Sequence, residues 1–536
     1  MKEKLTVSDL VIQQLINWDV KRIYAVAGDT ILEFFDKLTD YPEIELITAR
    51  HESAAAFMAS AEAKLTGQLT VCIGHNGPGA ANLINGLGDA YTDKCPVLVI
   101  TGQVERWNMG TNYKQYIHQQ GLLNGVTSFS ELAAHPDSVV DLLTKAMRMS
   151  QGQGTVSHLV IPKDLFTMKT DEKPRSKEPY LFTGPTQHDL IPEAAQKINY
   201  ASKPVILAGR GIIFAKDQTM ELAEKIGAGI VTTLPARGYI PSNHSCNLGG
   251  LGHAGSEAGT KALKESDLVI VLGATWWPHE YVPRDKSILQ IDTNSKNLGS
   301  TKRIEFGLVG KLENILPILV EKVNQKNVQE WRNRIQQLKN DWEERLADEA
   351  SKLTSPLQPQ TIIDKVNKYI ADDAIITLDV GDHVVWFNRS FKASNQNILV
   401  SGRWRSMGFG LPAACAAKLT YPDKEVILIT GDGGLSMVLG ELSEITRYQL
   451  PIKILVINNK SLAMEKNRMV VSQLTPNGVD LTNPDYAKVA TAFGITGYSV
   501  KKAEQLDEAL KKTFSTDKPV LVDIDTASTI PPHTKL

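Results

Sequence analysis

The chain has 536 residues, of which 42% are hydrophobic, and this is enough apolar material for about three domains with large cores. Its formal net charge of −2 at pH 7 gives no basic field, and we see no arginine-rich patch with interleaved aromatic residues, so we expect no nucleic-acid partner. The four cysteines lie far apart without CxxC spacing, which predicts neither a disulfide framework nor a structural zinc site.

The sequence also gives expectations about membranes. The N-terminal residues lack the uninterrupted apolar core of a signal peptide, and no stretch of about twenty apolar residues predicts a membrane span. We therefore expect a cytoplasmic protein without stable membrane insertion.

Taken in chain order, apolar strand-like runs alternate with segments of helical periodicity. Two polar, proline-bearing joints interrupt the alternation, one at residues 171–185 and one at 327–359, where a charged helical stretch precedes a proline-rich segment. The joints divide the chain into three parts, which we place at residues 1–175, 186–325 and 355–536. This pattern predicts an α/β protein with three doubly wound parallel-sheet domains.

The expected strands are short runs rich in β-branched residues. They include residues 44–47, 69–73 and 97–101 in the first part, 205–208 and 268–272 in the second, and 374–378, 425–430 and 453–457 in the third, with one helix over 435–449 between the last two.

The most informative pattern lies in the third part. Gly431-Asp432-Gly433-Gly434 follows one expected strand and Asn458-Asn459 follows the next, and a right-handed crossover places both strand ends at the same edge of a sheet. The amides of Gly433 and Gly434 can approach a diphosphate at the start of a helix. Asp432, Asn459 and the carbonyl of Ser461 supply the hard oxygen ligands that Mg²⁺ prefers. The pattern predicts a metal-diphosphate site; the alternative is a tight strand-to-helix turn and an unrelated Asn-Asn turn.

This pairing of Gly-Asp-Gly with Asn-Asn resembles the signature of thiamine diphosphate enzymes. The segments Arg405-Ser406-Met407-Gly408-Phe409-Gly410 and Gly77-Pro78-Gly79-Ala80-Ala81-Asn82 resemble the pyruvate oxidase and acetolactate synthase branch, and the resemblance covers nearly the whole chain. It names the three parts pyrimidine-binding, central and diphosphate-binding domains, with the first and third as structural cousins. The ending Ile530-Pro531-Pro532 is similar to that of pyruvate:quinone oxidoreductases, but only four residues follow it, so we do not expect their lipid-binding peptide.

The resemblance assigns residues to the cofactor. Glu52, in the segment Arg50-His51-Glu52-Ser53, is the expected catalytic glutamate that hydrogen bonds the aminopyrimidine ring, and we expect it to be largely buried; otherwise it is an ordinary acid in the first turn of a helix. By the same resemblance, the carbonyl of Arg405 is expected to accept a hydrogen bond from the cofactor's amino group. Met407 is expected to lie beneath the cofactor and hold it in a bent conformation. The Arg405 side chain either binds a substrate carboxylate or points to solvent or a partner subunit. Gly381, Asp382 and His383 contact the diphosphate from the side opposite Gly433.

The resemblance also places residues near the substrate. Gln115 matches a glutamine that is sent toward the substrate, and His118 and His75 are candidates for proton transfer or are ordinary surface histidines. Met464, a predicted cofactor contact, replaces the aromatic residue of pyruvate oxidases, and Arg468 replaces an acid. Glu465 matches a glutamate of pyruvate decarboxylases; the alternative is that it covers a solvated helix face.

The same resemblance raises the question of a flavin. Gly209, Arg210, Gly211, Gly273 and Asp292 occupy positions similar to the FAD-contacting loops of the oxidase branch. The Gly-x-Gly after residues 205–208 lacks the full dinucleotide fingerprint. Two tryptophans nearby either stack on a flavin or fill its space; they are Trp276 and Trp277.

The resemblance implies an enzyme that uses thiamine diphosphate and Mg²⁺ to decarboxylate a 2-oxo acid, with pyruvate the first choice. Oxidation of the resulting enamine through FAD is the leading expectation, and carboligation or aldehyde release, favoured by residues 464–468, is the alternative. A non-catalytic subunit is disfavoured because Glu52, Asp432 and Asn459 are all present. We expect a homodimer or homotetramer in which each active site is shared between two subunits.

Overall fold

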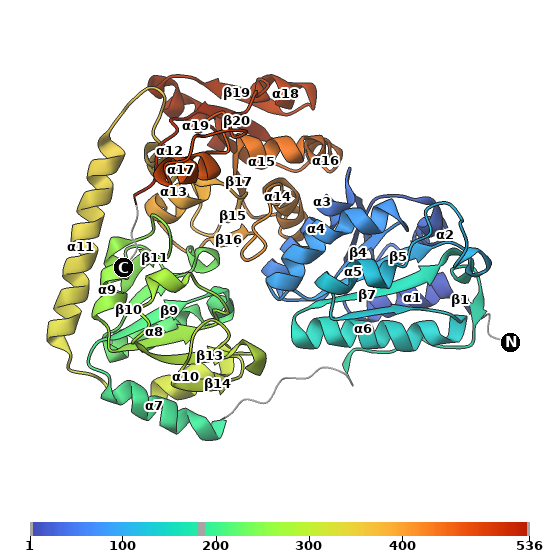
Figure 1. Ribbon diagram of the computed structural model, residues 1–536, viewed down its shortest axis with the longest axis horizontal. Helices are drawn as coiled ribbons and strands as arrows, with labels where there is room; N and C mark the ends of the chain where they lie inside the picture. Colours follow the sequence, from blue (N-terminus) through green and yellow to red (C-terminus); the bar gives the residue numbers. More distant parts are fainter. Residues whose placement is uncertain (1–3, 179–187, 533–536) are drawn as a thin grey trace. The chain divides into compact units, whose positions relative to one another are not determined.

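The structure is a computed structural model that describes residues 4–178 and 188–532. Three six-stranded parallel sheets, each with helices on both sides, form its framework (Figure 1). The prediction of an α/β protein with three doubly wound domains is therefore confirmed. Tertiary contacts divide the chain into two compact units, and the part of the first predicted joint from 179 onward lies outside the described residues.

The first unit contains the N-terminal sheet together with Ser401–Pro422 and Ser436–Leu450. The order of the strands in the sheet is β3-β2-β4-β5-β7-β6. Their bounds are β2 (Arg22–Ala25), β3 (Glu45–Thr48), β4 (Thr70–Gly74), β5 (Val97–Gln103), β6 (Phe129–Leu132) and β7 (Val156–Pro162), and the short strands β1 (Leu5–Thr6) and β8 (Lys169–Thr170) pair antiparallel.

Alternating side chains of this sheet enter two different layers, as a doubly wound sheet requires. Ile23, Val71 and Leu98 face one apolar core. That core is covered by α1 (Val7–Asn17), α2 (Leu32–Leu38) and α6 (Val139–Gln153), and the other layer contains α3 (Glu52–Thr66), α4 (Pro78–Thr92) and α5 (Gln119–Leu123).

The second unit contains the central sheet, in the order β11-β10-β9-β12-β13-β14. Within this domain the first strand, β9, lies beside the fourth, β12. This strand order is common among dinucleotide-binding domains. The strands are β9 (Pro204–Ala208), β10 (Gly229–Thr232), β11 (Asn247–Gly250), β12 (Leu268–Leu272), β13 (Ser287–Asp292) and β14 (Phe306–Val309). One face carries α7 (Ile191–Tyr200), α8 (Lys216–Ile226) and α10 (Leu312–Lys322), and the other carries α9 (Glu257–Glu265) and α11 (Gln329–Ser351).

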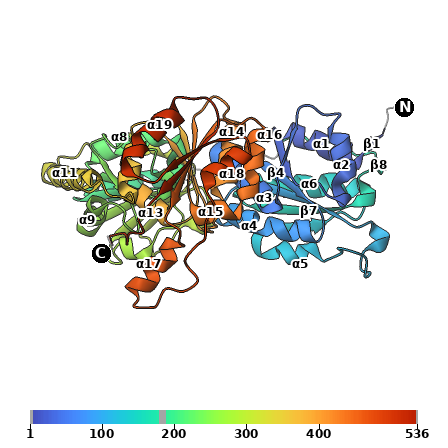
Figure 2. The same cartoon turned by 90° about the horizontal axis from the view of Figure 1, so that it is seen from above.

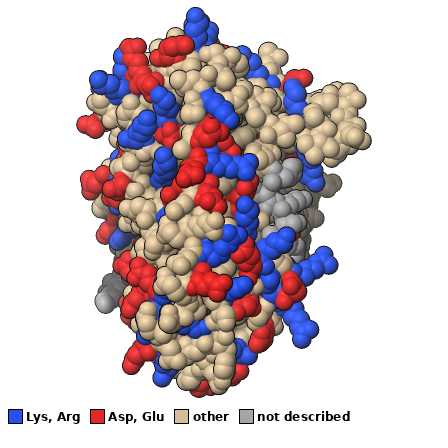
Figure 3. Space-filling model, turned by 90° about the vertical axis from the view of Figure 1, so that its left-hand side faces the viewer, with Lys and Arg blue, Asp and Glu red and all other residues tan. Residues whose placement is uncertain are grey.

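The long helix α11 lies in the second predicted joint and belongs to the core. Its buried Trp331, Ile335 and Trp342 pack on the central sheet, while Arg334 and Arg345 pair with Glu265 and Glu257 of α9. Figure 3 shows acidic and basic side chains interspersed over the face that lies to the left in Figure 1. Among the described residues, no helix is long and apolar enough to cross a membrane.

The C-terminal sheet also lies in the second unit, in the order β16-β15-β17-β18-β20-β19. The N-terminal sheet has the same arrangement. In each of these two sheets, counted along the chain, the sheet's first strand lies between its second and third, and its sixth lies between its fourth and fifth. The strands are β15 (Ile375–Leu378), β16 (Asn397–Val400), β17 (Val426–Gly431), β18 (Ile452–Asn458), β19 (Thr496–Val500) and β20 (Val520–Asp525). The remaining helices are α12 (Pro359–Val366), α13 (Asp382–Ser390), α14 (Gly410–Thr420), α15 (Asp432–Met437), α16 (Leu442–Arg447), α17 (Ala463–Val471), α18 (Tyr486–Ala492) and α19 (Leu506–Phe514).

The predicted single helix over 435–449 is wrong. The chain forms α15, then a 3-10 turn over Leu439–Glu441, and then α16. Val438 leaves the helical region, with φ −130° and ψ 25°, and Gly440 follows it. A β-branched residue and a glycine this close together weaken a helix, and here they break it.

Candidate functional site

Three loops of the second unit meet where β15, β17 and β18 end side by side. A Cβ atom on Gly434, after β17, would lie 2.6 Å from Oδ1 of Asp379, after β15. The backbone N–H of Ser461, after β18, donates to the carboxylate of Asp432. The structure thus brings together the two halves of the predicted metal-diphosphate pattern.

Asp432 is a buried carboxylate held by its neighbours. Its Oδ2 accepts from Nδ2 of Asn483 at 2.6 Å, and its backbone carbonyl accepts from the hydroxyl of Tyr486 at 3.0 Å. Burial raises the pKa of Asp432, although donors from Asn483, Gly433 and Ser461 act in the opposite direction.

Sequence reasoning missed Asn483 and Tyr486. They reach Asp432 because the chain after α17 folds back, with Ser461 paired to Asp480. Asn483 also donates to Oδ1 of Asn458 at 2.9 Å, so it joins the two motifs. The one available signal was the polar turn Asn483-Pro484-Asp485, and it is a common helix-capping pattern.

Two side-chain oxygen atoms in the loop after β18 bear on the predicted metal site, whose third expected ligand is the carbonyl of Ser461. Oδ1 of Asn459 and Oγ of Ser461 are buried, and within the described residues neither has a hydrogen-bond partner. A buried oxygen without a partner costs about 1–3 kcal/mol, which a bound cation removes. In the described parts of the chain no group of three His, Cys, Asp or Glu side chains can hold a metal, and here one carboxylate stands with neutral oxygens. That set suits Mg²⁺ with phosphate oxygens as further ligands.

The loop after β15 uses its side chains within the protein. Oδ2 of Asp382 accepts from Nε1 of Trp386 at 2.8 Å, and burial raises the pKa of Asp382 to about 6. Nε2 of His383 donates to the carbonyl of Asp379 at 3.0 Å, and burial lowers the pKa of His383 to about 4, so its ring is neutral at pH 7. The predicted contact of this loop with a diphosphate therefore stays a prediction that rests on its backbone groups.

Glu52 lies in the first unit, at the first residue of α3. Its Oε2 accepts from Nδ2 of Asn82 at 2.9 Å, and a Cβ atom on Gly79 would lie 3.2 Å from its Oε1. Glu52 has an intermediate exposure in the single chain, and its desolvation at the cofactor site stays a prediction.

The position of Glu52 is fixed by the residues before it. Both carboxylate oxygens of Glu441 accept from the backbone N–H of Arg50, at 3.1 and 3.2 Å, and Oε1 also accepts from that of His51 at 3.0 Å. Burial raises the pKa of Glu441 to about 7. Sequence reasoning missed Glu441 because it read this segment as a regular helix.

Gln115 and His75 lie together, with Oε1 of Gln115 3.1 Å from Nε2 of His75. His75 in turn lies close to Gly79, as Glu52 does. His118 caps α5, where its Nδ1 accepts from the backbone N–H of Gly121 at 3.3 Å. The structure therefore gathers Glu52, His75 and Gln115 and gives His118 a capping contact.

The loop that carries Arg405 and Met407 is fastened to α4 within the first unit. Asp93 accepts from the backbone N–H groups of Gly402 and Arg403 at 2.8 and 2.9 Å, and Nε1 of Trp404 donates to Asn85 at 2.8 Å. Arg405 is exposed with φ +55°, and Met407 is half-buried.

Three stretches of the chain match domain families. Residues 5–122 match "Thiamine pyrophosphate enzyme, N-terminal TPP binding domain", residues 191–319 match the central domain of these enzymes, and residues 379–524 match "Thiamine pyrophosphate enzyme, C-terminal TPP binding domain". The chain belongs to the thiamine pyrophosphate enzyme family. Thiamine pyrophosphate is another name for thiamine diphosphate.

Similar proteins span nearly the whole of this thiamine pyrophosphate enzyme. The "putative thiamine pyrophosphate-containing protein YdaP" of Bacillus subtilis is 36% identical over 524 residues, covering 97% of this chain and 91% of its own. The large subunit of acetolactate synthase isozyme 1 from Escherichia coli is 30% identical, covering 98% and 94%. Pyruvate oxidase of Lactiplantibacillus plantarum is 29% identical, covering 96% and 87%.

Helix α17 of this thiamine pyrophosphate enzyme carries the predicted substrate segment. Figure 2 shows the helix and the loop after it standing out from the rest of the second unit. Met464 is half-buried, whereas Glu465 and Arg468 are exposed. In the single chain the exposed position of Glu465 agrees with the alternative of a solvated helix face.

The candidate flavin loops meet in the central domain, where β9 and β12 end side by side. The backbone N–H of Gly211 donates to the carbonyl of Gly273 at 3.0 Å, and a Cβ atom on Gly209 would lie 2.4 Å from that carbonyl oxygen. Arg210 lies between these glycines and is half-buried. The two loops pack so closely that a side chain at Gly209 or Gly211 would collide with the other loop, which is a reason for glycine at these positions.

The other flavin candidates also make protein contacts. Asp292 accepts from the backbone N–H of Asn294 at 3.0 Å and from Asn297 at 2.8 Å. Trp277 is 1% exposed and belongs to the apolar core, while Trp276 is half-buried. Trp277 is thus a core residue of the central domain, and the role of the two tryptophans toward a flavin stays a prediction.

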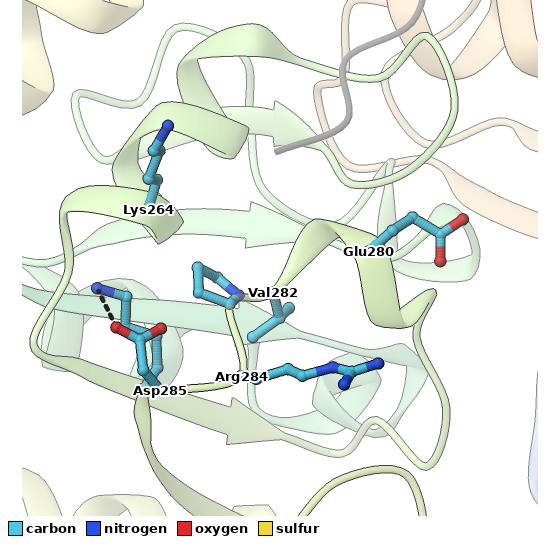
Figure 4. Close-up of a pocket in the computed structure, with 7 residues that line it drawn as sticks. Lys264, Glu280, Val282, Arg284 and Asp285 are labelled. Atoms are coloured by element: carbon cyan, nitrogen blue, oxygen red, sulfur yellow. Dashed lines mark ion pairs between the residues drawn. The ribbon is translucent and has the colours of Figure 1, made fainter.

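A separate pocket of about 420 Å³ lies between the end of α9 and the segment that leads into β13 (Figure 4). Its lining is mostly charged, with Lys286 and Asp285 paired at 3.9 Å. None of the predicted site residues lines it; the lining residues are Lys264, Glu280, Val282, Pro283, Arg284, Asp285 and Lys286.

Proposed function

We propose that this enzyme uses thiamine diphosphate and Mg²⁺ to decarboxylate a small 2-oxo acid, with pyruvate as the first choice. The observation that carries the proposal is the buried oxygen of Asn459, which has no hydrogen-bond partner within the described residues. The neighbouring Asn458 is linked through Asn483 to Asp432 of the glycine turn. The names of the relatives, acetolactate synthase and pyruvate oxidase, support a 2-oxo acid such as pyruvate.

When bound, the cofactor supplies the nucleophilic carbon and accepts the electron pair that is left when carbon dioxide departs. In our proposal Asp432, Asn459 and the carbonyl of Ser461 hold Mg²⁺. The amides of Gly433 and Gly434 bind the diphosphate from one side, and the loop of Gly381, Asp382 and His383 binds it from the other.

Glu52 is the proposed catalytic carboxyl group at the aminopyrimidine end, where it holds a proton on the ring nitrogen. In the proposal the carbonyl of Arg405 would accept a hydrogen bond from the amino group of the same ring, and Met407 would support the cofactor. Gln115 is proposed to contact the substrate carboxylate. Glu465 and His118 stay candidates for proton transfer, and Met464 a candidate cofactor contact.

For the fate of the substrate we propose oxidation, with FAD as the acceptor of two electrons and water or phosphate as the acceptor of the acyl group. Ligands of open α/β sheets bind where neighbouring strands lead in opposite directions, and Gly209 and Gly273 lie at that point between β9 and β12. Arg210, Gly211 and Asp292 are the further candidates. Carboligation without redox chemistry is the second candidate, favoured by Met464 where oxidases have an aromatic residue.

The subunits and domains complete the proposal. We propose domain bounds of 1–175, 186–325 and 355–536. We also propose a homodimer or homotetramer in which Glu52 of one subunit and Asp432 of another serve the same cofactor.

The test is to add pyruvate to the purified protein without oxygen, in the presence of thiamine diphosphate and Mg²⁺, while recording released carbon dioxide and the visible spectrum. We expect carbon dioxide and a flavin band that bleaches. If carbon dioxide is released and no flavin band is present, the proposed oxidation is wrong, and carboligation or aldehyde release takes its place as the proposed reaction. If no 2-oxo acid yields carbon dioxide, the proposed decarboxylation is wrong.

A further inference from the structure

We infer that His75 is a positioning residue, which fixes the side-chain amide of Gln115 with its N–H groups directed away from the imidazole and toward the substrate carboxylate. The inference rests on the proposed 2-oxo acid function. It concerns residues of the first unit only.

The hydrogen-bond partners of His75 determine which ring nitrogen carries the proton. The backbone N–H of Thr30 lies 3.3 Å from Nδ1 of His75, and a backbone N–H can only donate. Nδ1 is therefore an acceptor without a proton. In the neutral ring the proton must then be on Nε2.

The contact on the other side of the ring agrees with this assignment. Nε2 of His75 lies 3.1 Å from Oε1 of Gln115, and an amide oxygen can only accept. The N–H of His75 thus donates to the oxygen of Gln115, and the NH₂ group of Gln115 must point away from the ring. Because Gln115 is exposed, that group is accessible to a ligand.

The backbone of Gln115 is fixed by the same segment of the chain. Gln115 has φ +62°, a left-handed conformation that is uncommon for a residue other than glycine. Nδ2 of Asn76 donates to its carbonyl at 2.9 Å, and a Cβ atom on Gly77 would lie 2.7 Å from that oxygen. Unusual backbone held in this way is typical of functional sites.

The imidazole itself has little freedom. A Cβ atom on Gly28 would lie 2.4 Å from Cβ of His75, and one on Gly79 would lie 3.1 Å from the same atom and 3.2 Å from Oε1 of Glu52. His75 is thus held beside the proposed catalytic glutamate. A carboxylate needs N–H donors, and an inverted amide would present its oxygen and repel the substrate.

Two substitutions at this position separate positioning from packing. In His75→Gln the new amide nitrogen reaches the place of Nε2, so the donor to Gln115 is kept. In His75→Asn the amide reaches only the place of Nδ1, so that donor is lost. We expect His75→Asn to raise the KM for the 2-oxo acid about tenfold, corresponding to about 1.4 kcal/mol, with thiamine diphosphate affinity unchanged. His75→Gln should restore KM to within about threefold of the wild-type value.

The double variant His75→Asn/Gln115→Ala provides the second measurement. If His75 acts through Gln115, its KM should equal that of Gln115→Ala alone. Additive losses, or equal effects of His75→Gln and His75→Asn, would overturn the inference while leaving decarboxylation by the wild type intact. No turnover of any 2-oxo acid by the wild type would overturn the inference together with the proposed function.

Discussion

Asn458 and Asn459 are adjacent in the chain, yet their side chains have different surroundings. Asn458 donates to Asp523 at 2.9 Å and accepts from Asn483 at 2.9 Å, so it holds the folded chain together. Oδ1 of Asn459 has no partner within the described residues. At the scale of single residues, this difference separates a structural asparagine from the one that we propose as a metal ligand.

Replacing each asparagine by alanine should therefore have opposite results. Asn459→Ala should leave the melting temperature of the cofactor-free protein almost unchanged and remove most of the increase that thiamine diphosphate and Mg²⁺ produce. Asn458→Ala should lower the melting temperature without cofactor, because two buried hydrogen bonds are lost. Thermal unfolding with and without cofactor checks this; a full cofactor-induced increase in Asn459→Ala would contradict it.

Glu441 predicts a dependence on pH. Its pKa rises from 4.5 to about 7 in the folded protein, so the folded state binds this proton more tightly than the unfolded state. The resulting stability is present below about pH 4.5 and is lost as pH rises through about 7. The melting temperature of the wild type, relative to Glu441→Gln, should thus fall between about pH 5 and about pH 8.

The exposed Glu131 is the control for this measurement, since Glu131→Gln should follow the wild type at both pH values. If the difference in melting temperature between the wild type and Glu441→Gln does not change with pH, the carboxyl group of Glu441 does not titrate in this range.

At the scale of elements, α4 and the loop that carries Met407 act as one piece. The ring of Trp404 lies over Gly88 of α4, where a Cβ atom would come within 2.6 Å of it. In α6 a Cβ atom on Gly152 would meet nothing within 4 Å. The two helical glycines therefore form a matched pair.

Gly88→Ala should displace the loop and weaken thiamine diphosphate binding about tenfold or more, because Trp404 must move. Gly152→Ala should leave cofactor affinity unchanged and stabilise the protein by about 0.5–1 kcal/mol, since alanine favours a helix. Titration of the cofactor into both variants measures the effect. Equal affinities would mean that the loop does not depend on its contact with α4.

The sequence predicted the strands, and the edge of the C-terminal sheet at which Asp432 and Asn459 lie, better than it predicted the side-chain contacts around them. Short β-branched runs bounded by glycine are strong strand signals, and strand ends in a βαβ unit fix where Asp432 and Asn459 lie. The break at Val438 was missed because two weak helix residues compete with a long amphipathic pattern. Asn483 and the donor from His75 to Gln115 depend on how loops fold back, which local periodicity does not report.

At the scale of the whole molecule, the N-terminal and C-terminal sheets share one strand order, whereas the central sheet has another. Each outer sheet carries one part of the proposed cofactor site, with Glu52 on the first and Asp432 on the third. In our proposal two subunits complete each site, as a symmetric dimer allows.

Mixing two inactive variants tests this sharing. When Glu52→Gln and Asp432→Ala subunits are dissociated and reassociated in equal amounts, half of the dimers are mixed. Each mixed dimer then has one intact site, so activity should return to about a quarter of the wild-type value. If each site lay within one subunit, every site would keep one defect and no activity would return.

The most direct test of the central claim is the rate of carbon dioxide release from pyruvate by Glu52→Gln, measured with thiamine diphosphate and Mg²⁺ at saturation. Glutamine has nearly the same shape as glutamate but does not exchange a proton with the ring nitrogen. Our account predicts that the variant binds the cofactor as the wild type does and loses at least about a hundredfold in rate. A rate equal to that of the wild type would contradict it.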